Sequence, residues 1–461
     1  MAAVHKALST LNPRKSTGSD GISPRFLREC ADLLAPPITH LFCLSISSGE
    51  LPATWKIADV IPIPKSKTIE IDNLRPVSLL PVISKVREDF VLKSMKEKFL
   101  SIYGKNQHGF RPGASTLTAH IAIHDFITAS LDASNYSRVA LISFDLSRAF
   151  DKIHHKCLMN TLIDAQFPSA FLKWCGSFLR NRQQRVRTNG FISTLGDVTS
   201  GVPQGSKLAP YLFSSHMGAL IPSNTDSRIF KYADDVYVVI PFTKSSNVKY
   251  LIECEFSRIK NWCNSHGLVL NEKKTKIILF SKKRTQHQAL THMSTVSDLR
   301  ILGVIFQSNL GWNTHADHIC KLASQRIYIL KQLKRFEKIT KEDLIQIYNS
   351  CIRSVLEYNC PIFIGMNRKN KRKLELVRKR CHRIICGNDC RCDALESLDS
   401  RRERIAIKLF LKSMRCDSII RDIMPDFLPS SRRLRLPFSL TQRRSSSFIP
   451  SCTAIYNNKF S

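Results

Sequence analysis

Stretches of apolar residues along the first two thirds of the chain predict short β-strands. Val60–Ile63 and Val77–Leu80 are two such stretches joined by a polar loop, a pattern typical of a β-hairpin. Arg138–Phe144 is almost continuously apolar, as expected of a buried strand. Residues 228–240 predict a strand, a tight turn and a second strand. Two further strands are expected at Leu268–Leu270 and Lys276–Phe280.

Helical spacing of apolar residues becomes dominant after about residue 310. Ile319, Leu322, Arg326, Leu330 and Leu333 recur at steps of three and four residues, and all but the arginine are apolar. This spacing predicts a long helix with one buried stripe.

Two more helices are expected beyond this one. Thr340–Asp343 resembles a capping box, which predicts the start of a helix. A stripe from Leu374 to Ile384 predicts another helix, with Lys373, Arg380 and Arg383 lying off its apolar side. Helices are also predicted at Arg148–Leu162 and Lys249–Ser265, and the Ser- and Arg-rich last ~30 residues are expected to be loosely structured.

The size and charge of the chain point to a large protein with a polyanionic partner. A chain of 461 residues is too long for one ordinary core, so two to four subdomains are expected. The formal net charge is +33, and the segment from Arg368 onward holds 23 Lys and Arg against 9 Asp and Glu. Such an excess favours nucleic acid as the partner, with a generally basic soluble protein as the alternative.

Cysteine usage and hydropathy indicate an intracellular protein. The 15 cysteines are scattered and odd in number, which favours reduced thiols over a disulfide framework. No apolar run approaches the ~20 residues that span a bilayer, and Met1–Gly21 lacks the apolar core of a signal peptide. We therefore expect the nucleus or the cytoplasm, with no membrane segment and no secretion.

Three aspartates carry the candidate chemistry. Asp145 ends a predicted buried strand, and Asp234 and Asp235 occupy the predicted tight turn. An Asp-Asp pair alone is usually only a turn, but with a third carboxylate it could hold two Mg²⁺ ions roughly 3.5–4 Å apart. Mn²⁺ is an alternative to Mg²⁺. Such ions would activate a primer 3′-hydroxyl and neutralise the phosphates of a nucleoside triphosphate.

Short motifs around these aspartates follow one another in a fixed order. They are Arg14–Ile22, Leu51–Lys56, Leu74–Leu80, Asn106–Thr116, Asp145–Asp151, Gly201–Ser206, Tyr232–Asp235, Gly267–Thr275 and Leu302–Val304. In this order they resemble the reverse transcriptases of non-LTR (LINE-type) retrotransposons, most closely those of jockey- and CR1-like elements. The resemblance implies an RNA-directed DNA polymerase, which extends a primer with dNTPs on an RNA template.

The resemblance implies an α+β fold of the right-hand polymerase type, with fingers, a palm built on an antiparallel sheet and a helical thumb. Residues 1–115 would form an N-terminal extension and fingers, and 116–310 the palm with the remaining fingers elements. The reverse transcriptase domain itself would span about 45–310. A helical thumb would follow at 311–400, and a basic Ser/Arg-rich tail at 401–461.

The resemblance also assigns catalytic roles. Asp145, Asp234 and Asp235 would be metal ligands, together with the backbone carbonyl of Leu146. Lys274 would protonate the leaving pyrophosphate as a general acid, although Lys273 beside it is an alternative.

A second group of residues would bind the incoming nucleotide. Phe150 would lie under the sugar and exclude a ribose 2′-hydroxyl, and ordinary core packing is its alternative role. Lys65 and Arg75 would hold the triphosphate, although a lysine in a loop such as Lys65 is often only solvated. Gln204 and Gly205 would contact the nucleotide and the template. Arg111 would bind the backbone of the RNA template.

The sequence departs from the family pattern at two places near these motifs. Lys207 and Ala209 stand where the family usually has Val and Gly, and Asp89 stands where a Lys usually follows the Glu. The apurinic-type endonuclease that normally precedes this polymerase and would deliver its DNA primer is not among these residues, so a truncated genomic copy is expected. Whether an endonuclease is supplied elsewhere and the oligomeric state both stay open.

Two rival functions remain open from the sequence. An RNA-dependent RNA polymerase is one, although such enzymes usually carry Gly-Asp-Asp and an acidic residue at the place of Phe150. A catalytically inactive remnant that only binds RNA is the other. Zinc binding by Cys381, His382, Cys386, Cys390 and Cys392 is disfavoured because their spacing fits no standard zinc pattern. A surface or packing role is favoured over metal binding for His154 and His155.

Overall fold

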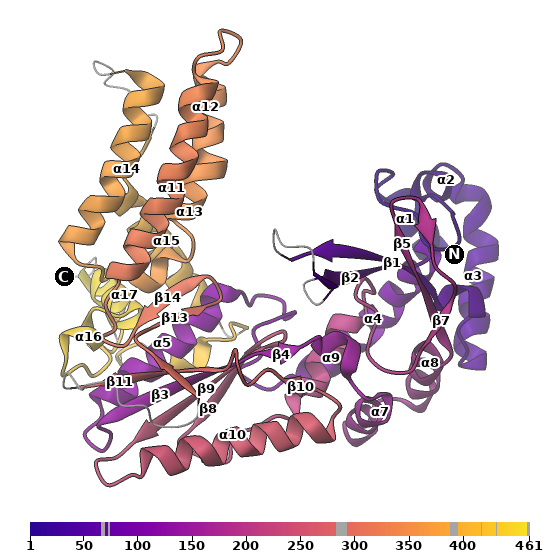
Figure 1. The fold of residues 1–461 in the computed structure, drawn as a ribbon, viewed down its shortest axis with the longest axis horizontal. Coiled ribbons are helices and arrows are strands. Elements are labelled where there is room, and N and C mark those ends of the chain that lie inside the picture. Colours follow the sequence, from indigo (N-terminus) through magenta and orange to yellow (C-terminus); the bar gives the residue numbers. More distant parts are fainter. Residues whose placement is uncertain are drawn as a thin grey trace. The chain divides into compact units, whose positions relative to one another are not determined.

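The computed structural model describes residues 1–65, 70–71, 74–282, 293–387, 395–415, 417–429 and 431–458. The chain forms two compact units (Figure 1). The first consists of Met1–Phe110, Leu146–Ile221 and Ser257–Asn271, and the second of Arg111–Asp145, Pro222–Phe256 and Glu272–Ser461. In the described part of the chain, no helix is both long and apolar enough to cross a membrane.

A five-stranded sheet forms the framework of the second unit. Its strand order is β12-β11-β3-β9-β8, and all neighbours are antiparallel except β11 and β12. Helix α5 (Thr116–Asp132) packs against β3, β8, β9 and β11, which explains why the central strand β3 is apolar on both faces. The strands are β3 (Arg138–Phe144), β8 (Arg228–Tyr232), β9 (Asp235–Phe242), β11 (Lys276–Ser281) and β12 (Ser294–Val296).

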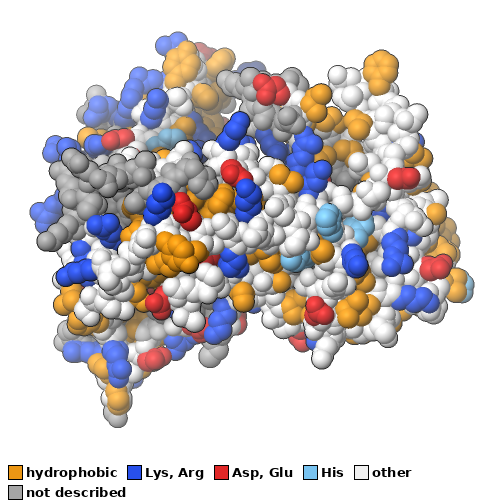
Figure 2. All heavy atoms as spheres, turned by 60° about the horizontal axis from the view of Figure 1, so that its bottom comes forward, with side chains coloured by type: hydrophobic (Ala, Val, Ile, Leu, Met, Phe, Trp, Pro, Cys, Tyr) orange, Lys and Arg blue, Asp and Glu red, His pale blue; other side chains and the backbone are white. Residues whose placement is uncertain are grey.

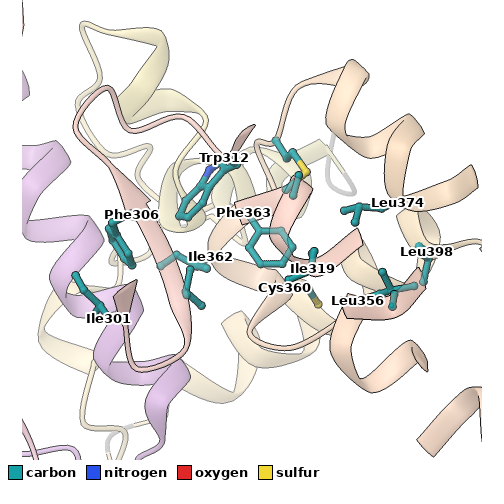
Figure 3. Packing of buried hydrophobic residues seen from close by; sticks show 14 of the residues in the cluster. Ile301, Phe306, Trp312, Ile319, Leu356, Cys360, Ile362, Phe363, Leu374 and Leu398 are labelled. Atoms are coloured by element: carbon teal, nitrogen blue, oxygen red, sulfur yellow. The ribbon is translucent and has the colours of Figure 1, made fainter. Parts of the chain in front are cut away.

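Helices after the sheet complete the second unit around one apolar core. Trp312, Phe306 and Phe363 meet in this core (Figure 3). The helical stripes expected from the sequence supply the rest, and Thr340 caps its helix through a capping box with Asp343 as predicted. The elements are β13 (Asp298–Ile301), β14 (Val304–Gln307), α11 (Asn313–Leu333), α12 (Lys341–Ile347), the π-helical turn η3 (Tyr348–Arg353), α13 (Ser354–Leu356), η4 (Cys360–Phe363) and α14 (Arg368–Cys386).

The C-terminal segment is folded, so the expectation of a loose end is wrong for the described residues. Phe448, Ile449 and Cys452 are buried in a second apolar cluster. Arg444 forms a buried ion pair with Asp125 on α5. These few apolar residues at helical spacing were hidden by the serines and arginines around them. The helices are α15 (Leu398–Ser413), η5 (Arg421–Ile423), α16 (Gln442–Ser445) and α17 (Phe448–Asn457).

The first unit combines a second sheet with helices. The predicted hairpin is present as β1 and β2, which pair antiparallel, while β1 pairs with β5 in parallel. The strands of this unit are β1 (Ile57–Pro64), β2 (Leu74–Leu79), β4 (Leu146–Ser147), β5 (Arg182–Thr188), β6 (Phe191–Ile192), β7 (Gly196–Val198) and β10 (Val269–Leu270). The helices are α1 (Ala2–Ser9), α2 (Pro24–Glu29), α3 (Ala31–Ser48), η1 (Ala53–Lys56), α4 (Val82–Ile102), α7 (His155–Asp164), α8 (Ser169–Leu179) and α9 (Ala209–Gly218).

One predicted helix is broken in two. Instead of a single helix over 148–162, the structure has α6 (Ala149–Lys152) and α7. Ile153 between them is extended and fully buried, and its carbonyl accepts a hydrogen bond from the N–H of Gly201. This contact takes the carbonyl away from the helix ladder. By contrast, α10 (Val248–Ser265) matches its prediction almost residue for residue.

Candidate active site

The turn between β8 and β9 presents two adjacent aspartates. Tyr232 pairs with Asp235, so Ala233 and Asp234 form a two-residue connection. Ala233 has a φ of 57°, a left-handed conformation that costs a non-glycine residue about 1 kcal/mol. Strain of this kind persists where the surrounding structure enforces it, and here the apolar strands on both sides do so.

The third aspartate lies at the neighbouring strand end. β3 and β9 pair with Phe144 opposite Val236, so Asp145 follows β3 beside the start of β9. The pKa of Asp235 is raised to about 6, first by shielding from water and then by the charges of Asp234 and Asp145. The three carboxylates therefore repel one another, and a cation among them would relieve that repulsion.

A lysine approaches this group from the other side of β3. The register of β11 against β3 places Lys276 opposite Ser143, so Lys274 precedes β11 at the level of Asp145. The Lys274 ammonium lies 4.0 Å from the Asp145 carboxylate, and its side chain is 70% exposed. An ammonium at this position lies at the same strand ends as the three aspartates.

The donor chemistry of the group suits a hard divalent cation. Carboxylate oxygens are what Mg²⁺ prefers, and Mg²⁺ keeps several waters and shares substrate phosphates rather than needing a full protein cage. Over the described ranges, no group of three or more His, Cys, Asp or Glu side chains is arranged so that it could hold a metal ion, the three aspartates included. A cation at these strand ends would therefore need water and substrate oxygens among its ligands.

The first unit holds most residues expected to bind the nucleotide. Phe150 is half-buried and stacks on Phe213, with ring centroids 4.2 Å apart and planes at 12°. Phe110 meets Phe150 edge-on at 6.1 Å. The Phe150 ring is thus fixed from two sides.

The loop that carries Gln204 and Gly205 is tied to its surroundings. The Gln204 side chain donates to Asp151 Oδ1 at 2.9 Å, and its carbonyl accepts from the N–H of Ser78 on β2 at 2.8 Å. Gly205 has a φ of 154°, and a Cβ there would lie 2.1 Å from the Ser78 carbonyl oxygen. Only glycine fits this approach of loop to strand.

The remaining predicted residues lie at four different places. Lys65 is exposed just after β1, near enough to Asp151 to lower its pKa, which burial raises overall. Arg75 is exposed on β2 opposite Ile63. Leu146 begins the short strand β4 and pairs with Leu270. Arg111, in the second unit, is half-buried in a loop.

The two groups of predicted residues therefore fall in different units. Asp145, Asp234, Asp235 and Lys274 gather in the second unit, and Arg111 belongs to the same unit. The nucleotide-binding group belongs to the first unit, and the division falls between Asp145 and Leu146. Its members are Lys65, Arg75, Phe150, Gln204 and Gly205, and Leu146, predicted as a metal ligand through its carbonyl, also belongs to the first unit.

A family model described as "Reverse transcriptase (RNA-dependent DNA polymerase)" matches residues 63–306, more than half of the chain. The chain belongs to this family. The fold class expected from the sequence, an α+β right-hand polymerase, agrees with the mixed sheets and helices of both units and with this membership.

Curated reverse transcriptase relatives match most of this chain. The RNA-directed DNA polymerase from mobile element jockey of Drosophila melanogaster is 24% identical over 404 residues, covering 83% of this chain and 43% of that protein. The probable RNA-directed DNA polymerase from transposon X-element of the same fly is 25% identical over 387 residues, covering 81% and 42%. The chain thus spans less than half the length of these relatives, and the resemblance to jockey-like non-LTR reverse transcriptases is confirmed.

Solved structures with a similar arrangement include telomerase of Candida tropicalis. The match to the structure of this telomerase in complex with a fragment of telomeric RNA covers 84% of this chain and 66% of the telomerase chain, with 11% identity and a TM-score of 0.43. The apo form covers 85% and 73%, with 10% identity and a TM-score of 0.42.

The structure adds residues that the motifs of the reverse transcriptase family did not single out. Glu88 on α4 accepts three hydrogen bonds from residues 206–208, directly after Gly205. Asp151 and Phe213 support Gln204 and Phe150. Glu88 carried no local sequence signal, because Arg87 and Asp89 flank it, and its partners lie more than 100 residues away.

Among the described residues, the other candidate ligands do not form a metal site. His155 is half-buried and contacts the Gly201 carbonyl at 2.7 Å, a packing role as expected, and His154 is exposed. Cys381 is buried and Cys386 half-buried, and neither is in a disulfide. Cys390 and Cys392, the other members of the predicted cluster, lie outside the described residues.

Proposed function

We propose that the chain is an RNA-directed DNA polymerase of a jockey-like non-LTR retrotransposon, which extends a primer 3′-hydroxyl with dNTPs on an RNA template. The observation that carries this proposal is the meeting of Asp145, Asp234 and Asp235 at adjacent strand ends. Family membership supplies the reaction class, and this group supplies a place for it.

Asp145, Asp234 and Asp235 would hold two Mg²⁺ ions, with help from the Leu146 carbonyl. When bound, such ions polarise the α-phosphate and stabilise charge on the attacking and leaving oxygens. The pKa of Asp235, at about 6, leaves its carboxyl mostly ionised at neutral pH and therefore ready to act as a ligand.

Lys274 would supply the proton for the departing pyrophosphate. Its ammonium lies 4.0 Å from Asp145, on the side where β11 begins. A general acid must lie within hydrogen-bond reach of the group that it protonates, and the side chain of Lys274 is 70% exposed beside Asp145, where a bound phosphate would lie.

Phe150 would select deoxynucleotides. A ring under the sugar excludes a 2′-hydroxyl only if it cannot move aside, and Phe213 stacked at 4.2 Å supplies that rigidity. This argument favours DNA synthesis over the rival RNA polymerase. Lys65 and Arg75 would hold the triphosphate, Gln204 and Gly205 the base pair, and Arg111 the template.

Basic side chains would bind the nucleic acid outside this site. Lys and Arg are spread over the face shown in Figure 2, where Asp and Glu are fewer. On α14, Arg380 and Arg383 are exposed, whereas Lys373 is paired with Asp317 on α11. We therefore expect Arg380 and Arg383, more than Lys373, to contact the phosphate backbone.

Primer extension on an RNA template with dNTPs and Mg²⁺ tests the proposal. The intact chain should give products, and Asp234→Ala should abolish them while RNA binding persists. Incorporation of rNTPs as readily as dNTPs would favour the rival RNA polymerase. RNA binding without any extension, under conditions in which a jockey-like relative is active, would identify the chain as an inactive RNA-binding remnant.

A further inference from the structure

A buried carboxylate holds the loop that follows Gly205. Glu88 lies on α4 and is fully buried. Its Oε2 accepts hydrogen bonds from the Ser206 hydroxyl at 2.5 Å, the Lys207 N–H at 2.7 Å and the Leu208 N–H at 3.2 Å. Three donors from one loop therefore converge on a single carboxylate oxygen.

The position of these donors explains how a carboxylate can be buried there. Residues 206–208 lead into α9, and the first N–H groups of a helix carry partial positive charge and lack helix partners. The Ser206 hydroxyl also accepts from the N–H groups of Leu208 and Ala209, so Ser206 and Glu88 together satisfy the start of α9. The burial of a charge is tolerable only with such partners.

Asp89, the next residue of α4, holds the same loop through an ion pair. Its Oδ1 lies 3.1 Å from the Lys207 ammonium, and its Oδ2 lies 2.9 Å from Lys93. These are the two places where the sequence departs from the family pattern, which has a Lys at the position of Asp89 and a Val at that of Lys207. The structure joins the two departures in one contact.

Further contacts fix the opposite side of the loop. Gln204 is bonded to Ser78 and to the Asp151 carboxylate, and Gly205 fits against the Ser78 carbonyl. The Gln204–Gly205 turn is thus held between β2 and α4. Most of the contacts to carboxylates come from the α4 side, and charge-assisted hydrogen bonds are roughly twice as strong as neutral ones.

We propose that Glu88 and Asp89 are positioning residues, which fix the Gln204–Gly205 turn in the geometry that binds the incoming dNTP. The proposal rests on the proposed function, because the turn is assigned to the nucleotide there. Neither carboxylate touches substrate. Each acts through the backbone or the side chain of residues 206–208.

Glu88→Gln tests the positioning role because it keeps the volume and one acceptor oxygen but removes the charge. In the protein without substrates, hydrogen–deuterium exchange at Lys207 and Leu208 should become faster by about tenfold, as expected for a weakened hydrogen bond to a charged group. The dNTP KM in primer extension should rise by about tenfold, with kcat changed less.

Asp59→Asn is the matched control. Asp59 is also buried in the first unit and pairs with Arg185 at 2.7 Å, but it makes no contact with the loop. Its substitution should lower thermal stability and leave exchange at Lys207 and Leu208 unchanged relative to the rest of the unit. If Glu88→Gln and Asp59→Asn gave the same exchange pattern, Glu88 would be only a core residue and the proposal would fail.

A reversal of the charge at residue 89 tests the positioning role of Asp89. Asp89→Lys alone should raise the dNTP KM, because it places a further ammonium beside Lys93 and Lys207. The double variant Asp89→Lys/Lys207→Val removes the ammonium of the loop and should return the dNTP KM to within about twofold of the wild type, since the repulsion between α4 and the loop is gone and only that from Lys93, on α4 itself, stays. Equal KM values for the single and double variants would overturn the role of Asp89.

The two proposals fail in different experiments. A wild-type chain that extends no primer refutes the proposed function. Hydrogen–deuterium exchange at Lys207 and Leu208 is measured without substrate, so it reports only on the contacts between Glu88 and the loop. Faster exchange at Lys207 and Leu208 with an unchanged dNTP KM would show that the loop is anchored but does not set nucleotide binding, and would overturn the positioning role.

Discussion

Two groups of carboxylates in this molecule are used in opposite ways. Asp145, Asp234 and Asp235 lie at exposed strand ends, crowd one another and raise the pKa of Asp235. Glu88 is buried and accepts three hydrogen bonds from the chain itself. The first group gathers like charges at strand ends, whereas Glu88 directs one oxygen, Oε2, to three donors of a single loop. A carboxylate crowded by like charges is therefore the better candidate for function, and one that accepts several hydrogen bonds the better candidate for architecture.

The largest difference should appear in activity. Asp235→Asn should reduce primer extension by about 10³-fold or more, since it removes a ligand where transition-state charge is neutralised. Its thermal stability should equal or exceed that of the wild type, because a repelled charge is lost. Single-turnover extension and thermal unfolding of the same preparation measure both. A variant that unfolds at a clearly lower temperature would place Asp235 with the architectural carboxylates.

Glu88→Ala should have the opposite effect from Asp235→Asn, with a large loss of stability and a smaller loss of activity. Removal of the carboxylate takes the acceptor from the Ser206 hydroxyl and from the Lys207 N–H, whereas the Leu208 N–H keeps its bond to Ser206 Oγ, and each lost acceptor costs about 1–3 kcal/mol. The free energy of unfolding in urea should fall by about 3 kcal/mol. Asp145→Ala is the control from the other group, and an equal loss of stability in both variants would break the comparison.

Substitution of Phe150 should have a smaller effect, on the preference for dNTPs over rNTPs. Phe150→Val should admit rNTPs, with the ratio of kcat/KM for dNTP over rNTP falling by about tenfold, because the excluded 2′-hydroxyl is worth on the order of one to two kcal/mol. Phe213→Leu, which removes the stacked ring, should lower the ratio less. An unchanged ratio in both variants would assign Phe150 to core packing.

Proton uptake should distinguish the groups more subtly. The pKa of the Asp235 carboxyl is raised to about 6 in the folded protein. Between its ordinary pKa and pH 6, this carboxyl therefore binds more protons in the folded state than in the unfolded state. The free energy of unfolding consequently falls as the pH rises through that window. In a buffer that contains a metal chelator, the melting temperature of Asp235→Asn should therefore lie further above that of the wild type at pH 7.5 than at pH 5. A gap that widens toward low pH would contradict the crowding of Asp235.

The smallest effect concerns basic side chains of α14 and the salt dependence of nucleic-acid binding. Among these side chains, too, exposed groups differ from paired ones. Arg380→Gln and Arg383→Gln should each reduce the slope of log K against log salt for RNA–DNA binding by about 1. Lys373→Gln should change the slope less, because Asp317 already pairs with that ammonium. Equal slopes for all three variants would remove α14 from the proposed interface.

Strand ends were predictable because apolar runs fix them locally. Arg138–Phe144 is a strand over the predicted residues, and the turn at Asp234 and Asp235 lies between two strands as expected. The antiparallel register that brings Asp145 to this turn follows from the burial of both faces of β3. The three carboxylates of the candidate site could thus be found from sequence pattern and family resemblance together.

Contacts between distant segments were not predictable. Glu88 and Lys207 are separated by 119 residues, and nothing local distinguishes a buried glutamate from a solvated one. The helix break at Ile153 has the same origin, since its carbonyl bonds to Gly201 from another segment. In the C-terminal segment, α17 is held by burial of Phe448 and Ile449 against residues far earlier in the chain, which composition alone does not reveal.

The interleaving of the two units bears on how the protein can be made. The first unit takes its last segment from residues 257–271, and the second takes its first from residues 111–145. On a ribosome that adds about 5–20 residues per second, neither core can close while the chain emerges through its first half. Both must wait with apolar surface exposed, so we expect synthesis of this chain to depend on chaperones, and a gene fragment that ends before residue 257 to leave both units incomplete.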